Sequence, residues 1–375
     1  MKSIQMVDLH GQYLKIKPEI DSAIQQVIDS SAFIKGEEVF RFQEELSAYM
    51  EGAHVVACGN GTDALQVAMM AMEFNPGDEV ITTPFTFIAT VEVIRLLGLK
   101  PVMVDVREDS FNLDPLLVEQ AITDRTRAIV PVHLFGQCAH MEPLLEIARE
   151  KNISIIEDTA QALGADYLFE DGQRQKAGTL GTIGTTSFFP SKNLGCFGDG
   201  GALFTRDALL ADRLKALVNH GMKKRYHYDY IGVNSRLDTL QAAILRVKLR
   251  KLEDYHRARQ QAAAFYDRVL GGCDGITPPV RSGFTTHVFH QYTLRVPDGS
   301  RDGLREHLKH KGIPSMVYYP VPLHLQKAYD DLGYRKGDLP VAERLSDQVL
   351  SLPMHTELEE EEQQFICNGI IEFFK

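Results

Sequence analysis

Three features are scarce in this sequence, and each scarcity excludes a class of protein. The 40 lysines and arginines are outnumbered by 51 acidic residues, and the formal net charge of -11 opposes nucleic-acid binding outside a local basic patch. The five cysteines are widely spaced and form no CxxC pair, so no zinc site or redox dithiol is indicated. No uncharged apolar run approaches the length of a membrane span, and the amino terminus lacks the apolar core of a signal peptide. We therefore expect a soluble, cytoplasmic protein with no metal, membrane or nucleic-acid partner.

The composition is that of an ordinary globular protein. Hydrophobic residues make up 44% and charged residues 24% of the 375 residues, which suits a large domain with a smaller companion. The one dense basic stretch is Lys223-Lys224-Arg225, followed by three aromatic or imidazole side chains at 226–228. Two interpretations of this stretch stay open: a site for a phosphate-bearing small ligand, or a solvated loop.

The first half of the chain alternates short β-rich runs with helical patterns. This order predicts an α/β fold whose large sheet is mostly parallel and covered by helices. Between the first two strands, residues 62–74 have a helical pattern that Pro76-Gly77-Asp78 ends. The seven expected strands lie near residues 54–57, 79–82, 101–105, 128–132, 154–157, 184–188 and 202–205.

The pattern changes after Leu237, where one long amphipathic helix is expected to link two domains. We expect a large domain over residues 1–240 and a smaller α+β domain over 241–375, which includes the linking helix. Within the smaller domain the sequence predicts strands at 290–296 and 315–319, a helix at 301–311, and a terminal helix opened by the acidic run 357–362.

The segment Gly59-Asn60-Gly61-Thr62-Asp63-Ala64 follows an expected strand and opens an expected helix. Backbone N–H groups at such a helix start favour phosphate. The segment also fits the loose dinucleotide pattern GxGxxA, but Asp78 and Glu79 precede the second strand, whereas a ribose-binding carboxylate should follow it. A phosphate site of another kind is therefore preferred over a nicotinamide site.

The run Ile155-Ile156-Glu157-Asp158-Thr159 brings two carboxylates to the carboxyl end of a buried strand, where open α/β sheets place their ligands. One interpretation is a helix cap for the residues that follow. The other is an ion pair with a protonated ring nitrogen, as in pyridoxal phosphate (PLP) enzymes, where an aspartate keeps the pyridinium protonated.

Lys192 follows an apolar strand end and precedes a run rich in glycine, from Gly195 to Gly201. A single lysine is ordinarily a solvated surface charge. Here the surrounding residues would desolvate the amine, lower its pKa and favour Schiff-base chemistry. The order of phosphate loop, aspartate strand and lysine loop together describes one cofactor, PLP.

With these motifs the chain resembles the sugar aminotransferases of the DegT/DnrJ/EryC1/StrS family, which have the fold of type I PLP enzymes. The resemblance extends over essentially the whole length and includes the spacing from Asp158 to Lys192. It is strongest to the branch that acts at C3 of UDP-linked 3-keto sugars, including UDP-2-acetamido-3-keto-glucuronate aminotransferases. The segments compared are 187–201, 232–243 and 351–355.

The resemblance implies a role for each matching residue. Lys192 would form the Schiff base and then move the proton between substrate carbon and cofactor, and Asp158 would pair with the pyridine nitrogen. Taken singly, each position could equally serve packing, capping or loop structure. The remaining cofactor residues would be Gln161 by the ring hydroxyl, Phe87 on the ring face, Gly61, Thr62 and Ser187 at the phosphate, and Asn234 at the phosphate of the neighbouring subunit.

The role of Asn234 makes the expected enzyme a homodimer with shared sites. L-glutamate is the expected amino donor, and a nucleotide-linked keto-sugar, aminated at C3, is the expected acceptor. The family pattern implies that the sugar–nucleotide cleft is lined by Gln12, Tyr13, Phe33, Arg236, Tyr319 and His324. Of these, Arg236 suits a carboxylate, by bidentate pairing.

One departure from the family pattern bears on the sugar. The C3 uronate enzymes tend to have a histidine before the Tyr-Pro of the small domain, whereas this chain has Tyr318-Tyr319-Pro320. A UDP-3-keto-N-acetylhexosamine or its uronate is the first expectation, and a dTDP-3-keto-6-deoxyhexose is the alternative. A nicotinamide-dependent sugar dehydrogenase and a non-catalytic regulator on the same scaffold are the alternatives from other classes.

Overall fold

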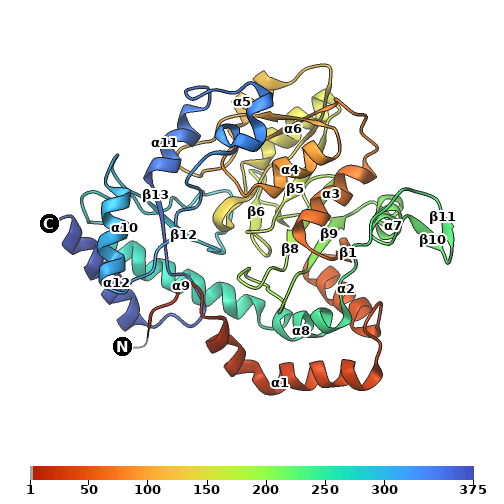
Figure 1. The fold of residues 1–375 in the computed structure, drawn as a ribbon, viewed down its shortest axis with the longest axis horizontal. Helices are drawn as coiled ribbons and strands as arrows, with labels where there is room; N and C mark the ends of the chain where they lie inside the picture. Colours follow the sequence, from red (N-terminus) through yellow and green to blue (C-terminus); the bar gives the residue numbers. More distant parts are fainter. Residues whose placement is uncertain (1–2) are drawn as a thin grey trace.

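The computed structural model describes residues 3–375, and its centre is a single seven-stranded sheet (Figure 1). The strand order is β1-β9-β8-β5-β4-β2-β3, in which β9 runs antiparallel to both neighbours and the other pairs are parallel. The mostly parallel seven-stranded sheet is therefore confirmed. The strands are β1 His54–Cys58, β2 Glu79–Thr82, β3 Lys100–Met103, β4 Thr126–Ile129, β5 Ser154–Asp158, β8 Ile183–Ser187 and β9 Gly201–Thr205.

Helices cover both faces of this sheet. Alternate residues of a strand point to opposite faces, so neighbouring residues of one strand pack against different helices. In β5, Ile156 packs with residues of α3 and α7, whereas Ile155 packs with residues of α6 on the other face. Most residues of these strands are buried, as expected for strands covered on both faces, and the buried residues include polar ones such as Thr185 and Thr186 of β8. The helices around the sheet are α2 Glu37–Tyr49, α3 Gly61–Ala71, α4 Ala89–Leu96, α5 Pro115–Ala121, α6 Met141–Lys151 and α7 Ala208–Leu217.

The expected linking helix is two helices, α8 (Thr239–Leu249) and α9 (Leu252–Leu270). Arg250 and Lys251 separate them. Helix α8 packs against α2 and against α1 (Leu9–Ser30), which runs beside it in Figure 1. Helix α9 instead packs against the last helix, α12 (Glu360–Phe373). The apolar pattern continues across this junction, so no local signal in the sequence marks the break.

The carboxyl-terminal part has its own apolar cluster, in which residues of α9 and α12 pack with a two-stranded sheet. That sheet pairs β12 (Tyr292–Arg295) with β13 (Val349–Leu352). The strand predicted at 315–319 is wrong: only Met316 makes a β-bridge there, to Ser351, because prolines at 314 and 320 bound the segment and cannot donate ladder hydrogen bonds. The helices here also include α10 Arg301–His310 and α11 Pro340–Gln348.

Two further hairpins extend from the main sheet: β6 Asp166–Leu168 with β7 Arg174–Lys176, and β10 Met222–Lys224 with β11 His227–Tyr228. The basic stretch lies in the β10–β11 hairpin, at the outer edge of the molecule in Figure 1, and Lys223 pairs there with Asp229 at 3.3 Å. Over residues 3–375, no helix has the length and apolar character of a membrane span, and no group of three or more potential ligands could hold a metal ion.

Candidate active site

Lys192 lies in the loop between β8 and β9, and backbone contacts fix the shape of that loop. The N–H of Phe188 donates to the carbonyl of Gly200 at 2.7 Å, and the N–H of Lys192 donates to the carbonyl of Phe189 at 2.8 Å. A side chain at Gly195 is impossible without a shift, because its Cβ would lie 2.3 Å from the carbonyl oxygen of Pro190. Gly195 is therefore required by the close approach of this loop to its own backbone.

The Lys192 amine is in an unusual state for a lysine. Burial lowers its pKa from 10.5 to about 8, and the negative charge of Asp158 opposes that shift in part. Within residues 3–375 its ammonium has no salt bridge or side-chain hydrogen bond within the usual distances. A half-buried amine with a lowered pKa and no protein partner is suited to nucleophilic and acid–base chemistry.

Helix α8 supports the Lys192 loop from beneath. The buried Lys248 donates from Nζ to the carbonyl of Gly195 at 2.5 Å. About two turns earlier in the same helix, Gln241 accepts from the N–H of Phe197 at 2.8 Å and donates to the Phe197 carbonyl at 3.2 Å. Burial also lowers the pKa of Lys248 to about 8, but this amine is committed to a backbone carbonyl.

Asp158 ends β5, at the carboxyl edge of the sheet, and is only 6% exposed. Its Oδ2 accepts a hydrogen bond from the Thr90 hydroxyl at 2.9 Å, and its Oδ1 accepts one from the N–H of Ala160 at 3.1 Å. Because the residue after β5 is not the start of an α-helix, the helix-cap interpretation of Asp158 is not what the structure shows.

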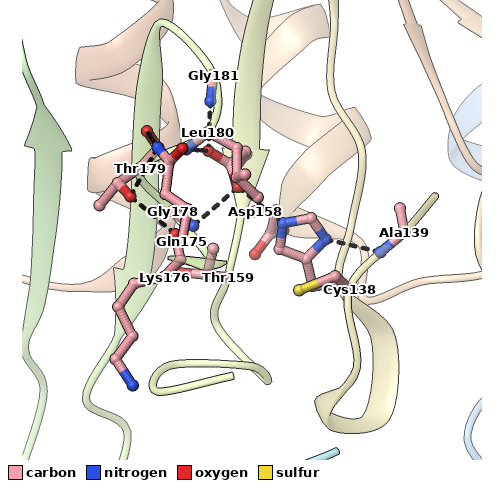
Figure 2. Close-up of polar contacts among 12 residues, drawn as sticks. Cys138, Ala139, Asp158, Thr159, Gln175, Lys176, Gly178, Thr179, Leu180 and Gly181 are labelled. Carbon is pink, nitrogen blue, oxygen red and sulfur yellow. Dashed lines mark hydrogen bonds and ion pairs between the residues drawn. The ribbon is translucent and has the colours of Figure 1, made fainter. Parts of the chain in front are cut away.

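The neighbouring carboxylate, Glu157, has a different environment on the opposite face of the strand. It accepts from three backbone N–H groups of the turn before β8, those of Gly178, Leu180 and Gly181, at 2.7–2.8 Å (Figure 2). It also lies 2.9 Å from Nε2 of His133, whose Nδ1 accepts from a backbone N–H. That second bond places the proton of a neutral imidazole on Nε2, so His133 donates to Glu157.

The phosphate-binding candidates come together in space. Asn60 caps α3, since its side chain accepts from the N–H of Asp63 at 2.8 Å, so the N–H groups of Gly61 and Thr62 belong to a first turn without intrahelical acceptors. Ser187, at the end of β8, lies directly opposite: a Cβ at residue 61 would be 2.6 Å from the Cβ of Ser187. The arrangement suits an anion at the positive end of the helix.

The segment that carries Asn234 and Arg236 passes beside this loop. The hydroxyl of Ser235 accepts from the N–H of Gly59 at 2.9 Å, which fixes the segment against the start of the phosphate loop. The Asn234 side chain itself is exposed. The structure thus places Asn234 near the surface of its own chain and does not bring it into the group formed by Gly61 and Ser187.

Gln161 and Phe87 differ in how firmly they are held. The side chain of Gln161 accepts from the N–H of Phe135 at 2.8 Å and donates to the hydroxyl of Tyr319 at 3.1 Å. It therefore links the end of β5 to the carboxyl-terminal part of the chain. Phe87 is 58% exposed, which leaves its ring available to a ligand.

The residues expected to line a sugar–nucleotide cleft differ in their exposure and in their hydrogen-bond partners. His324 is 2% exposed and lies 3.0 Å from Glu343, so in this structure it is part of the packing. Gln12 donates to Thr356 at 3.2 Å, and Tyr13 donates to Asp21 at 2.7 Å. Phe33 is exposed and pairs through its backbone carbonyl with Thr239.

Arg236 borders a surface cavity of about 720 Å³ that Lys35, Gln43 and His54 also line. Its Nε is buried without a hydrogen-bond partner in the described chain. Burial, and to a lesser extent the positive charge of Arg236, lowers the pKa of Lys35. Two cations thus face one another at this cavity, an arrangement that favours an anion.

The acidic residues required by the dinucleotide interpretation are engaged elsewhere. Glu79 begins β2, is almost fully buried, and pairs with Lys100 at 3.0 Å and Arg125 at 3.2 Å. Asp78 accepts from the N–H of Asn75 in the preceding turn. Neither carboxylate lies at the carboxyl end of the strand, where a ribose would be bound.

Sequence reasoning did not find Thr90, His133 or Lys248. Each contacts a candidate residue or its loop only through tertiary structure: Thr90 is 68 positions before Asp158, and Lys248 is 53 positions after Gly195. A threonine and a lysine inside apolar helical runs carry no local signal. For His133, the only signal was its place just beyond a buried strand.

The residues present fit PLP. A carboxylate that accepts hydrogen bonds on both oxygens can hold a ring N–H, a desolvated amine can form the Schiff base, and the start of α3 with Ser187 forms a cradle that any side chain at residue 61 would fill. These three groups project from the edge of one sheet.

Comparison with known proteins agrees with this chemistry. The model of the DegT/DnrJ/EryC1/StrS aminotransferase family matches residues 14–371. A pleiotropic regulatory protein of Geobacillus stearothermophilus is 46% identical, over 100% of this chain and 99% of the relative. A UDP-2-acetamido-2-deoxy-3-oxo-D-glucuronate aminotransferase of Pseudomonas aeruginosa is 45% identical, over 98% of this chain and 99% of the relative. A dTDP-3-amino-3,4,6-trideoxy-alpha-D-glucose transaminase of Streptomyces venezuelae is 43% identical, over 99% and 96%.

Solved structures give the same result. DesV of S. venezuelae, solved in complex with a ketimine intermediate, superposes with a TM-score of 0.96 at 42% identity and covers 100% of this chain and 99% of its own. NtdA of Bacillus subtilis, solved with bound cofactor PMP, superposes with a TM-score of 0.89 at 31% identity, over 96% of this chain and 82% of its own. This chain belongs to the DegT/DnrJ/EryC1/StrS aminotransferase family and is a PLP-dependent sugar aminotransferase.

Proposed function

We propose that this enzyme transfers an amino group from L-glutamate to C3 of a UDP-linked 3-keto-N-acetylhexosamine or its uronate. The observation that carries the site assignment is the Lys192 amine, which burial leaves with a pKa of about 8 and without a protein partner, facing the charge of Asp158. Support for C3 comes from two similar relatives with different nucleotides, one named for a 3-oxo sugar and the other for a 3-amino sugar.

In this proposal each residue has one task. PLP supplies the electron sink that stabilises negative charge at the substrate carbon. Lys192 takes the proton from Cα of the amino acid and later delivers a proton to C3 of the sugar. Asp158 would pair with the protonated ring nitrogen. Gln161 would lie by the ring hydroxyl and Phe87 would stack on the ring, while Gly61, Thr62 and Ser187 would bind the phosphate.

The proposal includes a homodimer with shared sites. Asn234 is exposed on its own chain, and its neighbour Ser235 is fixed against the phosphate loop at Gly59. An exposed amide on a fixed segment can serve a second subunit, so we assign Asn234 to the phosphate of the partner's site. Gln12, Tyr13, Phe33 and Tyr319 keep their assignment to the sugar–nucleotide cleft as part of the same proposal, whereas the buried His324 is assigned to packing against Glu343.

A uronate is the preferred sugar because of Arg236. The Nε of Arg236 is buried without a hydrogen-bond partner in the described chain. An ionised sugar carboxylate could pair with the Arg236 guanidinium in a bidentate manner. The cavity that Arg236 shares with Lys35 is not the basis of this preference, because Lys192 and Asp158 do not line it.

A dTDP-3-keto-6-deoxyhexose is the second candidate. The S. venezuelae relative is named for a dTDP-linked amino sugar, and DesV superposes over the whole chain. The name of the G. stearothermophilus relative is regulatory, but an amine and a carboxylate with the environments of Lys192 and Asp158 favour a working active site here.

The test begins with the visible absorption spectrum of the purified protein before and after L-glutamate. The protein should be yellow and should bleach when the donor is added. The bleached enzyme is then offered UDP-3-keto-N-acetylglucosamine, its uronate and a dTDP-3-keto-6-deoxyhexose, and recovery of the yellow colour reports amination. Arg236→Gln should weaken only the uronate reaction. Equal loss with all three sugars would refute the carboxylate assignment, and failure to bleach would refute L-glutamate as donor.

A further inference from the structure

Helix α4 carries one polar side chain on its buried face. The buried residues of this helix are Ala89, Thr90, Val91, Val93 and Ile94, and Thr90 is 1% exposed. A hydroxyl in such a position needs a hydrogen-bond partner, because an unpaired buried hydroxyl is costly. Its partner is Oδ2 of Asp158, at 2.9 Å.

The backbone of Asp158 is already fixed from both sides. On one side its N–H donates to the carbonyl of Pro131 at 2.9 Å and its carbonyl accepts from the N–H of His133 at 3.0 Å. On the other side it pairs in parallel register with Thr185 of β8. The remaining freedom of this residue is rotation of the carboxylate, which the backbone contacts do not restrict.

Thr90 and Ala160 remove that freedom. Each donates to a different oxygen of the carboxylate, Thr90 from its hydroxyl and Ala160 from its N–H. A hydroxyl has one proton to give and an ionised carboxylate can only accept, so the direction of the Thr90 bond is fixed while Asp158 is ionised. A β-branched side chain in a helix has few χ1 rotamers, which keeps the donor in place.

We propose that Thr90 is a positioning residue for the transamination reaction: through its hydrogen bond it holds the Asp158 carboxylate oriented toward the ring nitrogen of the cofactor. A carboxylate held in this orientation can pair with the protonated ring nitrogen, on which the electron sink of the cofactor depends. This inference rests on the proposed role of Asp158.

The experiment compares Thr90→Val with Thr90→Ser in the purified enzyme. Valine matches the shape of threonine without the hydroxyl, and serine keeps the hydroxyl without the methyl. Thr90→Val should lower kcat about tenfold, the factor that corresponds to losing a hydrogen bond to a charged group. It should also raise the Kd of the cofactor-free protein for PLP by a similar factor. The KM for L-glutamate should not change. Thr90→Ser should stay within about threefold of the wild type in each measurement.

The matched control is Thr82→Val, the same change in another fully buried threonine. The Thr82 hydroxyl donates to the carbonyl of Val130 at 2.9 Å, so its loss should lower stability in urea and leave kcat and the PLP Kd unchanged. Wild-type values for Thr90→Val, or equal losses in Thr90→Val and Thr90→Ser, would overturn the role of the hydroxyl. Should the valine variant not fold, Thr90→Ala makes the same comparison.

The outcome also separates this inference from the proposed function. An active wild type with an unaffected Thr90→Val variant would refute only the positioning role. A wild type that neither binds PLP nor bleaches with L-glutamate would refute the proposed function and the positioning role together.

Discussion

Lys192 and Lys248 share one loop: Lys192 belongs to it, and Lys248 donates to it from α8, to the Gly195 carbonyl at 2.5 Å. Burial lowers the pKa of each amine to about 8. Among residues 3–375 they differ in that the Lys248 amine has a hydrogen-bond partner and the Lys192 amine has none. A lowered pKa alone would therefore not distinguish them, whereas the hydrogen-bond partners do.

We expect Lys192→Ala to abolish the yellow colour and to lower turnover by roughly three orders of magnitude, the scale of a lost general acid–base. Lys248→Met is the matched variant, since it also removes a buried amine. It should keep the colour and lower the free energy of unfolding by about 1–3 kcal/mol, because the Gly195 carbonyl loses its donor. Absorption spectra and urea unfolding measure both effects. Colour retained in Lys192→Ala would place the Schiff base elsewhere.

The pKa of Lys192 predicts a pH dependence for cofactor capture. Only a neutral amine attacks an aldehyde, and the neutral fraction rises as the pH passes upward through the pKa. The rate at which cofactor-free protein combines with PLP should therefore rise to a plateau with a midpoint near pH 8, and not near the 10.5 of an ordinary lysine. Stopped-flow absorption measures this midpoint over pH 6–10, a range that includes the lowered pKa of about 8 and approaches the ordinary value of 10.5.

The charge of Asp158 raises the pKa of Lys192, so removing that charge should act in the opposite direction. In Asp158→Asn the midpoint is expected to move to lower pH, while turnover falls because the ring nitrogen loses its counter-ion. A midpoint that moved upward would contradict the assigned direction of the interaction. An unchanged midpoint would mean that the two groups are electrostatically independent.

Glu157 is a stabilising carboxylate by its contacts, in contrast to Asp158. Three backbone N–H groups and Nε2 of His133 donate to it, so the amide of Glu157→Gln would turn an NH₂ group toward donors. We expect a loss of about 3–5 kcal/mol in the free energy of unfolding, as for breaking a buried charged network. Glu170→Gln, an exposed position in the same part of the chain, should change it by less than about 0.5 kcal/mol. Urea denaturation measures the free energy of unfolding of both variants, and equal small losses in the two would contradict the stabilising role of Glu157.

The sequence predicted the central sheet well because its strands are short, mostly buried β-rich runs that turn and helical segments separate. It also brought Asp158 and Lys192 to the correct edge, since β5 ends at Asp158 and the loop of Lys192 follows β8. A residue at the end of a strand or directly after it must lie at the edge of the sheet where that strand ends, so its position can be predicted once the strand has been located.

The errors have physical causes that local patterns cannot reveal. The segment 315–319 has strand-like residues, but its flanking prolines restrict it to the single bridge between Met316 and Ser351. The true partner of β12 is β13, a four-residue run immediately after α11. Thr90 was missed because its only unusual property is a contact made 68 residues away. The exposure of Asn234 and the burial of His324 likewise depend on tertiary packing.

Gly61 offers a test of the phosphate site that involves no charged residue. A Cβ at this position would lie 2.6 Å from the Cβ of Ser187, so Gly61→Ala must push the start of α3 away from the end of β8. We expect the Kd for PLP to rise at least about tenfold, since a shift of an ångström is enough to misalign a bound phosphate. Equilibrium dialysis of PLP against the cofactor-free protein measures this.

Gly272→Ala is the matched control for that change, because a Cβ there meets nothing within 4 Å and its φ is not positive. It should leave the PLP Kd unchanged and so account for any general effect of a glycine-to-alanine change. If Gly61→Ala bound PLP as tightly as Gly272→Ala, the phosphate could not lie between α3 and Ser187. The cradle would then have to be sought elsewhere along the edge of the sheet, beginning with the exposed Asn234 segment.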